Sequence, residues 1–171
     1  MEAGLDSGPV LAEVRTDITD DDTGGSLHDR LSRLAADLLA RHLDDLAQGV
    51  LVPRLQDESL VTYASKLDKG EATLNWQQDA AQLERQVRAF NPWPVAQTRY
   101  QGQVLRVWSA KAIDGAAGGV PGGVLAAGKA GIDVACGSGC LRLLTIQLPG
   151  GKRLSAAEFL NARAVDGVVL E

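Results

Sequence analysis

The hydrophobic positions in the first half of the chain recur at the spacing of a helix. Between residues 23 and 49 the apolar residues that recur at this spacing include Leu27, Leu31, Leu34, Leu38, Leu39 and Leu46. Because residues three and four apart share one face of a helix, this spacing predicts an amphipathic helix. Thr23 or Ser26 can cap its start, and Gly49 follows its end. Ahead of the acidic loop that precedes this helix, residues 9–14 (PVLAEV) predict a short strand.

A second helical pattern begins at residue 79. Asp79 can cap it, and Glu84 and Arg88 stand one turn apart on its polar side. Its apolar stripe is Ala80, Leu83, Val87 and Phe90. The stretch between the two helices, residues 49–70, has no clean period and is predicted to be a linker.

After residue 95 the pattern changes to that of short strands separated by glycine-containing turns. The predicted strands are Ala96–Tyr100, Val104–Ala112, Gly123–Ala127, Ile132–Cys136 and Leu141–Leu148. A closing helix is predicted at Ser155–Arg163, because Ser155 followed by Glu158 forms a capping box. Five short strands and a preceding helix favour an OB-like β-barrel, and an open sandwich of four or five strands is the alternative.

These elements give an α+β chain in three parts. One strand and one helix cannot enclose a core, so residues 1–48 are interpreted as the C-terminal part of a larger α/β domain. Residues 49–70 form the linker, and residues 71–171 form the OB-like domain. We expect the leucine face of residues 1–48 to be exposed when nothing else covers it.

Composition and charge narrow the class of protein. No apolar run approaches the roughly 20 residues of a membrane span, and the N-terminus lacks the pattern of a signal peptide. With only two cysteines, the expected location is the cytoplasm. The net charge is −5, but residues 1–70 hold 7 Lys/Arg and 14 Asp/Glu, whereas residues 71–171 hold 10 Lys/Arg and 8 Asp/Glu. An anionic partner would therefore meet the second part.

Few residues carry the pattern of a chemical site. Asp6, in the loop GLDSG, is placed as catalytic acids often are, although residue types alone favour a turn-forming Asp. His28 and His42 lie fourteen residues apart on one helix, too far apart to share a metal. Cys136 and Cys140 flank a Gly-Ser-Gly turn and are interpreted as small buried residues, since two ligands do not make a zinc site. No metal site is expected.

The stretch AFNPWP, residues 89–94, predicts a stiff elbow after the second helix. Each proline fixes φ and removes a backbone donor, so Asn91, Pro92, Trp93 and Pro94 cannot continue a helix. Trp93 is thereby held on a short rigid support. It could be a platform on which a nucleobase stacks. The favoured interpretation is that it packs the helix onto the following strands.

Several stretches taken together resemble the methionyl-tRNA formyltransferase family. They are MEAGLDSGPVL, DTGGSLHDRL, QDESLVTYASKL, VRAFNPWP and GIDVACGSGCLRLLTIQLPGGKRLSAAEFLN. Each is weak alone, but their order and separation along the whole chain are specific. AFNPWP points to this family rather than to related sugar or folate formyltransferases.

The resemblance implies an activity, a donor and a partner. The family transfers a formyl group from 10-formyltetrahydrofolate to the amino group of methionine on initiator tRNA. Its fold is a Rossmann-like catalytic domain joined by a linker to an OB-like barrel that helps to hold the tRNA. Of the family's catalytic Asn, His and Asp, only the Asp of the GLD-T/S-G loop is present, as Asp6. Asp6 would position the attacking amine or relay its proton.

The chain also departs from the family. The catalytic Asn, the catalytic His and the folate-binding strands precede residue 1, so we expect a fragment of a longer product, or a misassigned start, that is inactive alone. Asn75 stands where an Asp is usual before Trp76, and Cys140 replaces a typical Ala. The first change bears on a polar contact near the linker.

Candidate tRNA contacts are the basic residues of the linker and barrel, which would bind phosphates without reading sequence. They are Lys66, Lys69, Arg85, Arg88, Arg99, Arg106, Arg142, Lys152 and Arg153. Each could equally be a solvated surface charge. The resemblance implies no DNA or membrane partner and a monomeric full-length enzyme. Two other readings stay open, a catalytically dead RNA-binding module and a β-barrel interaction domain without an RNA role.

Overall fold

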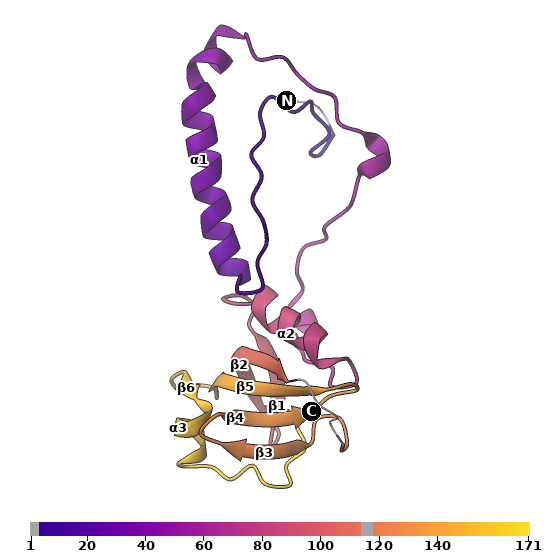
Figure 1. The fold of residues 1–171 in the computed structure, drawn as a ribbon, viewed down its shortest axis with the longest axis vertical. Coiled ribbons are helices and arrows are strands. Elements are labelled where there is room, and N and C mark those ends of the chain that lie inside the picture. The colour runs from indigo at the N-terminus through magenta and orange to yellow at the C-terminus, as the bar shows by residue number, and fades with distance from the viewer. Residues whose placement is uncertain (1–3, 114–117) are drawn as a thin grey trace. The chain divides into compact units, whose positions relative to one another are not determined.

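The computed structural model describes residues 4–113 and 118–171 (Figure 1). The first three residues of the stretch MEAGLDSGPVL therefore lie outside the described part. The chain divides into two compact units. The first comprises the described residues up to Asp21 together with Ser26–Lys66, and the second comprises Asp22–Gly25 and Leu67–Glu171.

The first unit is built around one long helix. Helix α1 spans Gly24–Gln48, close to the predicted bounds. All 25 of its residues are described, and none is buried. Leu31, Leu39 and Leu46 are exposed, and Leu27, Leu34 and Leu38 are half-buried, so the leucine face is only partly covered by the described residues.

The predicted strand at residues 9–14 is wrong. Only Val10 makes a bridge, and its partner is Arg54 in the predicted linker. The linker itself contains a short 3₁₀ helix, η1 (Glu58–Leu60), and a second one, η2 (Lys69–Ala72), begins at its end; Asp57 and Asp68 cap them. A short apolar run reads as a strand from sequence, but a strand needs a partner along its length, and here pairing stops after one residue.

The second unit is an antiparallel sheet with two helices (Figure 1). Its strands are β1 (Ala96–Tyr100), β2 (Gln103–Ile113), β3 (Val124–Gly128), β4 (Gly131–Ala135), β5 (Cys140–Gln147) and β6 (Leu154–Ser155). The order in the sheet is β1-β2-β5-β4-β3, with β6 paired to β5. The five predicted strands are thus confirmed to within a residue or so at each end, and β6 was missed.

The β1–β2 hairpin shows how local sequence sets the register. Tyr100 pairs with Gln103, which leaves a two-residue turn of Gln101 and Gly102. Both turn residues have positive φ, 50° and 76°. Such a turn matches the twist of the strands, and glycine adopts it without a steric penalty. A register shift between Val107 and Ser109 then bends β2.

No strand pair joins the two edge strands, β1 and β3, among the described residues, so the sheet is not closed. The C-terminal segment, residues 168–171, lies against both edges instead. Its Leu170 N–H donates to Gly122 O (2.8 Å), just before β3, and the Val124 N–H donates to Val168 O (2.9 Å). Glu171 exchanges two backbone hydrogen bonds with Arg99 of β1.

The core lies between the inner face of the sheet and helices α2 (Ala80–Ala89) and α3 (Ala156–Leu160). Helix α2 contributes Leu83 and Val87, both almost fully buried, and Asp79 caps it through the Gln82 N–H. The capping box of Ser155 and Glu158 starts α3 as predicted, although α3 ends earlier than expected. The buried face of the predicted second helix is therefore confirmed.

Candidate functional site

The loop that carries Asp6 is exposed and has an uncommon backbone conformation. Asp6 has a φ of 52°, in the left-handed region that non-glycine residues seldom occupy. The side-chain amide of Gln56 is hydrogen-bonded to the backbone of this loop. Its Nε2 donates to the carbonyl oxygens of Asp6 (2.8 Å) and Gly8 (2.7 Å). The site of the predicted catalytic acid thus includes a residue of the predicted linker.

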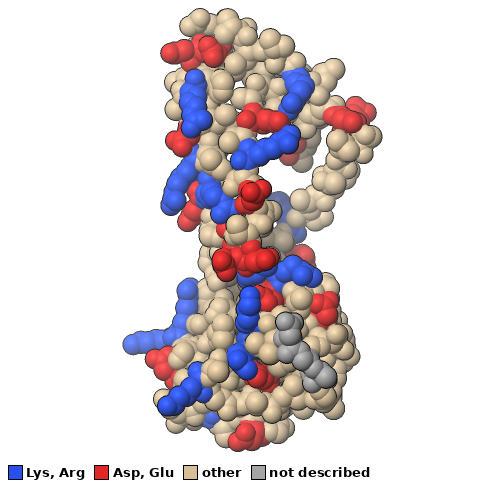
Figure 2. Space-filling model, in the orientation of Figure 1, with Lys and Arg blue, Asp and Glu red and all other residues tan. Residues whose placement is uncertain are grey.

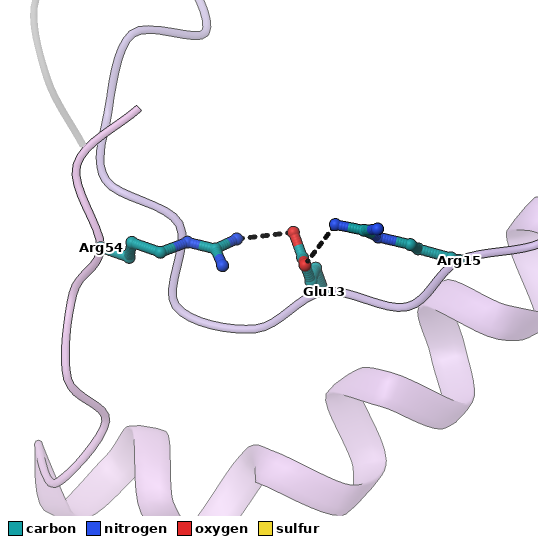
Figure 3. Close-up of polar contacts among 3 residues, drawn as sticks. All are labelled: Glu13, Arg15 and Arg54. Carbon is teal, nitrogen blue, oxygen red and sulfur yellow. Dashed lines mark hydrogen bonds and ion pairs between the residues drawn. The ribbon is translucent and has the colours of Figure 1, made fainter. Parts of the chain in front are cut away.

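The same linker segment is fastened to the chain beyond the loop. Val10 and Arg54 exchange two backbone hydrogen bonds of 2.9 Å. Figure 3 shows the Arg54 guanidinium pointing at the Glu13 carboxylate, with Arg15 on its other side. The Arg54 Nη2–Glu13 Oε2 distance is 2.6 Å. The hydrogen bond and the charge of Arg54 lower the pKa of Glu13. We call residues 54–57 the strap.

The elbow begins where α2 ends, as predicted. The Asn91–Pro92 and Trp93–Pro94 peptide bonds are both cis. The Asn91 side-chain amide donates to the backbone oxygen of Trp108 (2.9 Å), and the Val95 N–H donates to Phe90 O (2.9 Å). The elbow is therefore tied to β2.

The favoured interpretation of Trp93 is not supported, because its side chain does not join the core. Trp93 is 55% exposed, whereas Phe90 is only 8% exposed. Phe90 closes the apolar stripe of α2, so this smaller aromatic does the packing that we expected of Trp93. The interpretation of Trp93 as a stacking platform remains open.

The elbow also contacts the segment in which α1 begins. The Gly25 N–H donates to Asn91 O (2.9 Å), and Arg88 Nη1 donates to Asp22 O (3.0 Å). A Cβ atom on Gly25 would lie 2.7 Å from Pro92 Cδ, and one on Gly24 would meet the carbonyl oxygen of Ala89. Two of the recognised stretches, DTGGSLHDRL and VRAFNPWP, are thus in direct contact, and the contact requires glycine.

The candidate tRNA residues come from several elements of the chain. Lys66 belongs to the first unit, while the others lie on η2, α2, β1, β2, β5 and the segment before β6 of the second unit. Figure 2 shows Lys and Arg interspersed with Asp and Glu on the visible face of the second unit. The exposed members are Lys66, Lys69, Arg85, Arg99, Arg106, Lys152 and Arg153.

Two basic residues are held by structural contacts. Arg142 makes two hydrogen bonds to the carboxylate of Asp133 across β4 and β5 (2.6 and 2.8 Å), which raises the pKa of Arg142. Its other register partner, Lys111, lies 3.1 Å from Glu84 of α2. Each of these two neighbouring basic residues thus has its own carboxylate partner, Asp133 for Arg142 and Glu84 for Lys111. Arg88 is held through the backbone of Asp22.

Arg153 stacks on an aromatic ring at the elbow end of the sheet. Its guanidinium carbon lies 3.2 Å from the centroid of the Trp108 ring. The Trp108 indole N–H donates to Gln147 Oε1 (2.8 Å), and Gln147 faces Arg106 in the strand register. The structure therefore brings Arg106 and Arg153 to the end of the sheet that carries the elbow.

The two cysteines are free and buried, as expected for small core residues. Burial raises the pKa of Cys136 to about 11 and also raises that of Cys140. Within the described residues, no group of three or more His, Cys, Asp or Glu is placed to hold a metal ion. None of the helices in that part is both long and apolar enough to span a bilayer.

Asn75 keeps a polar contact at the position where the family has Asp. Its Oδ1 accepts from the Gln77 N–H (3.1 Å). An aspartate oxygen could accept the same bond, so the substitution preserves this turn. The next residue, Trp76, is buried and donates to Thr98 Oγ1 (3.0 Å).

Residues 66–164 match the protein family described as "Formyl transferase, C-terminal domain". This match covers more than half of the chain. The chain belongs to this family. The matched region contains the linker end, α2, the elbow, the sheet and α3, so the family features are those that build the second unit.

Two bacterial relatives named methionyl-tRNA formyltransferase are similar to almost the whole chain. The protein of Methylococcus capsulatus is 53% identical over 98% of this chain and 54% of its own length. That of Stutzerimonas stutzeri is 52% identical over 95% of this chain and 51% of its own length. The chain thus spans about half the length of the curated relatives it matches.

Among solved structures, HypX from Aquifex aeolicus in complex with tetrahydrofolic acid has a similar fold. The TM-score is 0.69 at 20% identity, over 98% of this chain and 30% of that chain. At this identity the likeness shows the fold alone. It extends over both units, including the part of the chain that precedes the matched family domain.

Sequence reasoning missed three contributors, Gln56, the Gly24–Gly25 pair and Trp108. Gln56 lies in a stretch that belongs to the resemblance, but its partners are 48 and 50 residues away. Nothing in the local pattern points to them. The glycines lie in another recognised stretch, but their close neighbour, the elbow, is distant in sequence.

Proposed function

We propose that this chain is part of a methionyl-tRNA formyltransferase. The enzyme transfers the formyl group of 10-formyltetrahydrofolate to the amino group of methionine on initiator tRNA, in the cytoplasm, as translation begins. The observation that carries the proposal is the identity of about half of all residues to enzymes of that name over 95% or more of the chain. A shared domain alone would leave other formyl acceptors possible, whereas identity that also covers α1 and the acid loop favours this acceptor.

Asp6 is proposed as the catalytic acid of the chain. It lies in an exposed loop with an uncommon backbone conformation, as functional residues often do. The amine of methionine must lose a proton as it attacks the formyl carbon. A carboxylate within hydrogen-bond reach can orient that amine and favour the loss of its proton. The supporting Asn and His are proposed to lie in the part of the relatives that this chain does not cover.

The donor site is proposed to lie largely outside these residues as well. HypX is described in complex with tetrahydrofolic acid, which supports a folate as the kind of donor. A hollow beside α3 is lined by residues such as Lys129, Asn161 and Arg163 and does not include Asp6. In this proposal the chain supplies the acid loop rather than the folate pocket.

The second unit is proposed as the tRNA-holding domain. We assign residues 1–48 to the end of a Rossmann-like catalytic domain, 49–70 to the linker and 71–171 to an OB-like barrel. The C-terminal segment supports the barrel, because it hydrogen-bonds to both edges of the sheet. Arg106, Lys152 and Arg153 are the strongest phosphate-binding candidates, since they are exposed. Lys152 and Arg153 are adjacent in sequence, and Arg106 pairs with Gln147, which accepts from the Trp108 ring on which Arg153 stacks.

The competing proposal is a catalytically dead RNA-binding module. Formyl transfer from 10-formyltetrahydrofolate to methionyl initiator tRNA, measured with the full-length gene product that carries residues 1–171, separates the two. Transfer that is lost in Asp6→Asn supports the enzyme. Retained tRNA binding without any transfer by the wild-type product would favour the module. The full-length enzyme is proposed to act as a monomer.

A further inference from the structure

Within the described part of the chain, the acid loop is held by the strap. Gly4, Leu5, Asp6 and Ser7 are all exposed, and Leu5 is 93% exposed. The loop is therefore not fixed by burial in a core. A φ of 52° at Asp6 is also a conformation that a free chain would rarely populate. Something must select it, and hydrogen bonds are the restraint that the structure offers.

The amide of Gln56 is built to provide that restraint. One NH₂ group carries two donors, and both are used, on the carbonyl oxygens of Asp6 and Gly8. These carbonyls lie on either side of Ser7, so a single side chain fixes the backbone just after the acid. Turning either peptide would break one of the two bonds.

Gln56 is itself held on both sides. Two residues before it, Arg54 is paired to Val10 by backbone bonds and to Glu13 by an ion pair. Directly after it, the Asp57 carboxylate accepts from the Ser59 N–H (2.9 Å) and caps η1. The position of the amide is thus set by the strap, and the strap is fixed to the chain beyond the loop.

We propose that Gln56 is a positioning residue that holds the Asp6 carboxylate in its working orientation, so that the linker takes part in building the active site. The inference rests on the proposed function of Asp6. It gives Arg54, Gln56 and Asp57, whose polar groups make these contacts, a part in building the active site. A change that detaches the strap would lower the rate of formyl transfer without removing any group that touches a substrate.

The test is an isosteric substitution. In Gln56→Glu the side chain keeps its shape but loses both donors at neutral pH. Leu55→Ala, at a neighbouring side chain that is 83% exposed, is the matched control. In the full-length product we expect kcat to fall roughly tenfold to a hundredfold in Gln56→Glu, as for other small misplacements of a catalytic group. KM for both substrates should stay near the wild-type value, and Leu55→Ala should leave both constants unchanged.

A second measurement uses the 171-residue chain and does not depend on activity. Backbone NMR order parameters of residues 5–8 should drop in Gln56→Glu and stay unchanged in Leu55→Ala. Unchanged order parameters would overturn the bracing role even if the enzyme proposal stands. Lower order parameters with an unchanged kcat, or a rise in KM alone, would overturn the catalytic consequence. A wild-type product that transfers no formyl group would refute the proposed function instead.

Discussion

The two units hold their residues in place by different means. The second unit has a continuous core in which Leu83, Leu141 and Leu143 are completely buried. In the first unit, a helix of 25 described residues buries none of them, and the acid loop is held by the strap. The second unit is stabilised mainly by the burial of apolar side chains. The acid loop of the first unit is held by a small number of hydrogen bonds.

This difference shows what an amphipathic pattern can and cannot establish. The leucines of α1 and the stripe of α2 follow the same helical spacing, and both segments are helices. Only α2 has a sheet to pack against. The period of a sequence therefore predicts the helix, whereas its burial depends on a partner that the period does not name.

The largest expected effect comes from removing matched leucines in the two units. Leu143→Ala should destabilise the second unit by about 2–5 kcal/mol, because it leaves a cavity in a close-packed core. Leu39→Ala, at a side chain that is 55% exposed, should change stability by less than about 0.5 kcal/mol. Urea unfolding followed by tryptophan fluorescence measures the first, since Trp76 and Trp108 are buried in the second unit, and unfolding followed by circular dichroism, to which α1 contributes, measures the second. Equal losses would mean that the leucine face is packed in solution.

A somewhat smaller effect is expected where α1 begins. Gly24→Ala places a Cβ against the backbone of Ala89 and should cost about 1–3 kcal/mol through overpacking. Gly128→Ala, where an added Cβ meets nothing within 4 Å, is the control. Hydrogen exchange should report faster opening of the Gly25–Asn91 hydrogen bond in the first variant only. An unaffected bond would show that the segment can shift at little cost.

Much of the second unit could be predicted from sequence because its signals are local. Alternating side chains, the Gln101–Gly102 turn, the Asp79 cap and the capping box at Ser155 each act within a few residues. The two-residue strand β6 was missed because so short a segment has no period. The contact of residues 168–171 with both sheet edges was missed for another reason, since it joins backbone groups far apart in the chain.

The candidate site was less accessible to sequence reasoning. Asp6 was found through the resemblance, and residue types alone favoured a turn. Gln56 had no signal, because a single glutamine in a polar stretch is ordinary. Phe90 makes the contact with the core that we expected of Trp93. The prolines predict a rigid support, but they do not predict in which direction the side chain on that support points.

A moderate effect is expected from substituting basic residues of the second unit. Some of these residues are proposed to bind tRNA, and others stabilise the fold through ion pairs. Lys152→Ala should weaken tRNA binding and reduce the slope of log K against log salt by about 1, as expected when one phosphate contact is lost. Arg142→Ala should lower stability instead, because it leaves the Asp133 carboxylate without its paired donors. Salt titrations and urea unfolding of both variants give the comparison. A change in the salt slope for Arg142→Ala would place that residue at the RNA.

The smallest effect concerns the strap and pH. Because Arg54 lowers the pKa of Glu13 below the ordinary 4.5, the ion pair contributes above that pH and is lost as the pH falls through the lowered pKa. The NMR signals of the Arg54 guanidinium should therefore shift as the pH falls below 4.5 and through the lowered pKa of Glu13. Glu13→Gln should abolish the shift. A shift that persists in this variant would mean that another carboxylate titrates there.

The central claim is that the second unit supplies affinity for tRNA through charged contacts. The direct measurement is a gel-shift titration of initiator tRNA with the 171-residue chain at two salt concentrations, with circular dichroism to show that the chain is folded. The account predicts binding at low salt that weakens as salt rises. A folded chain that does not bind at low salt, or binding that salt does not change, would contradict it.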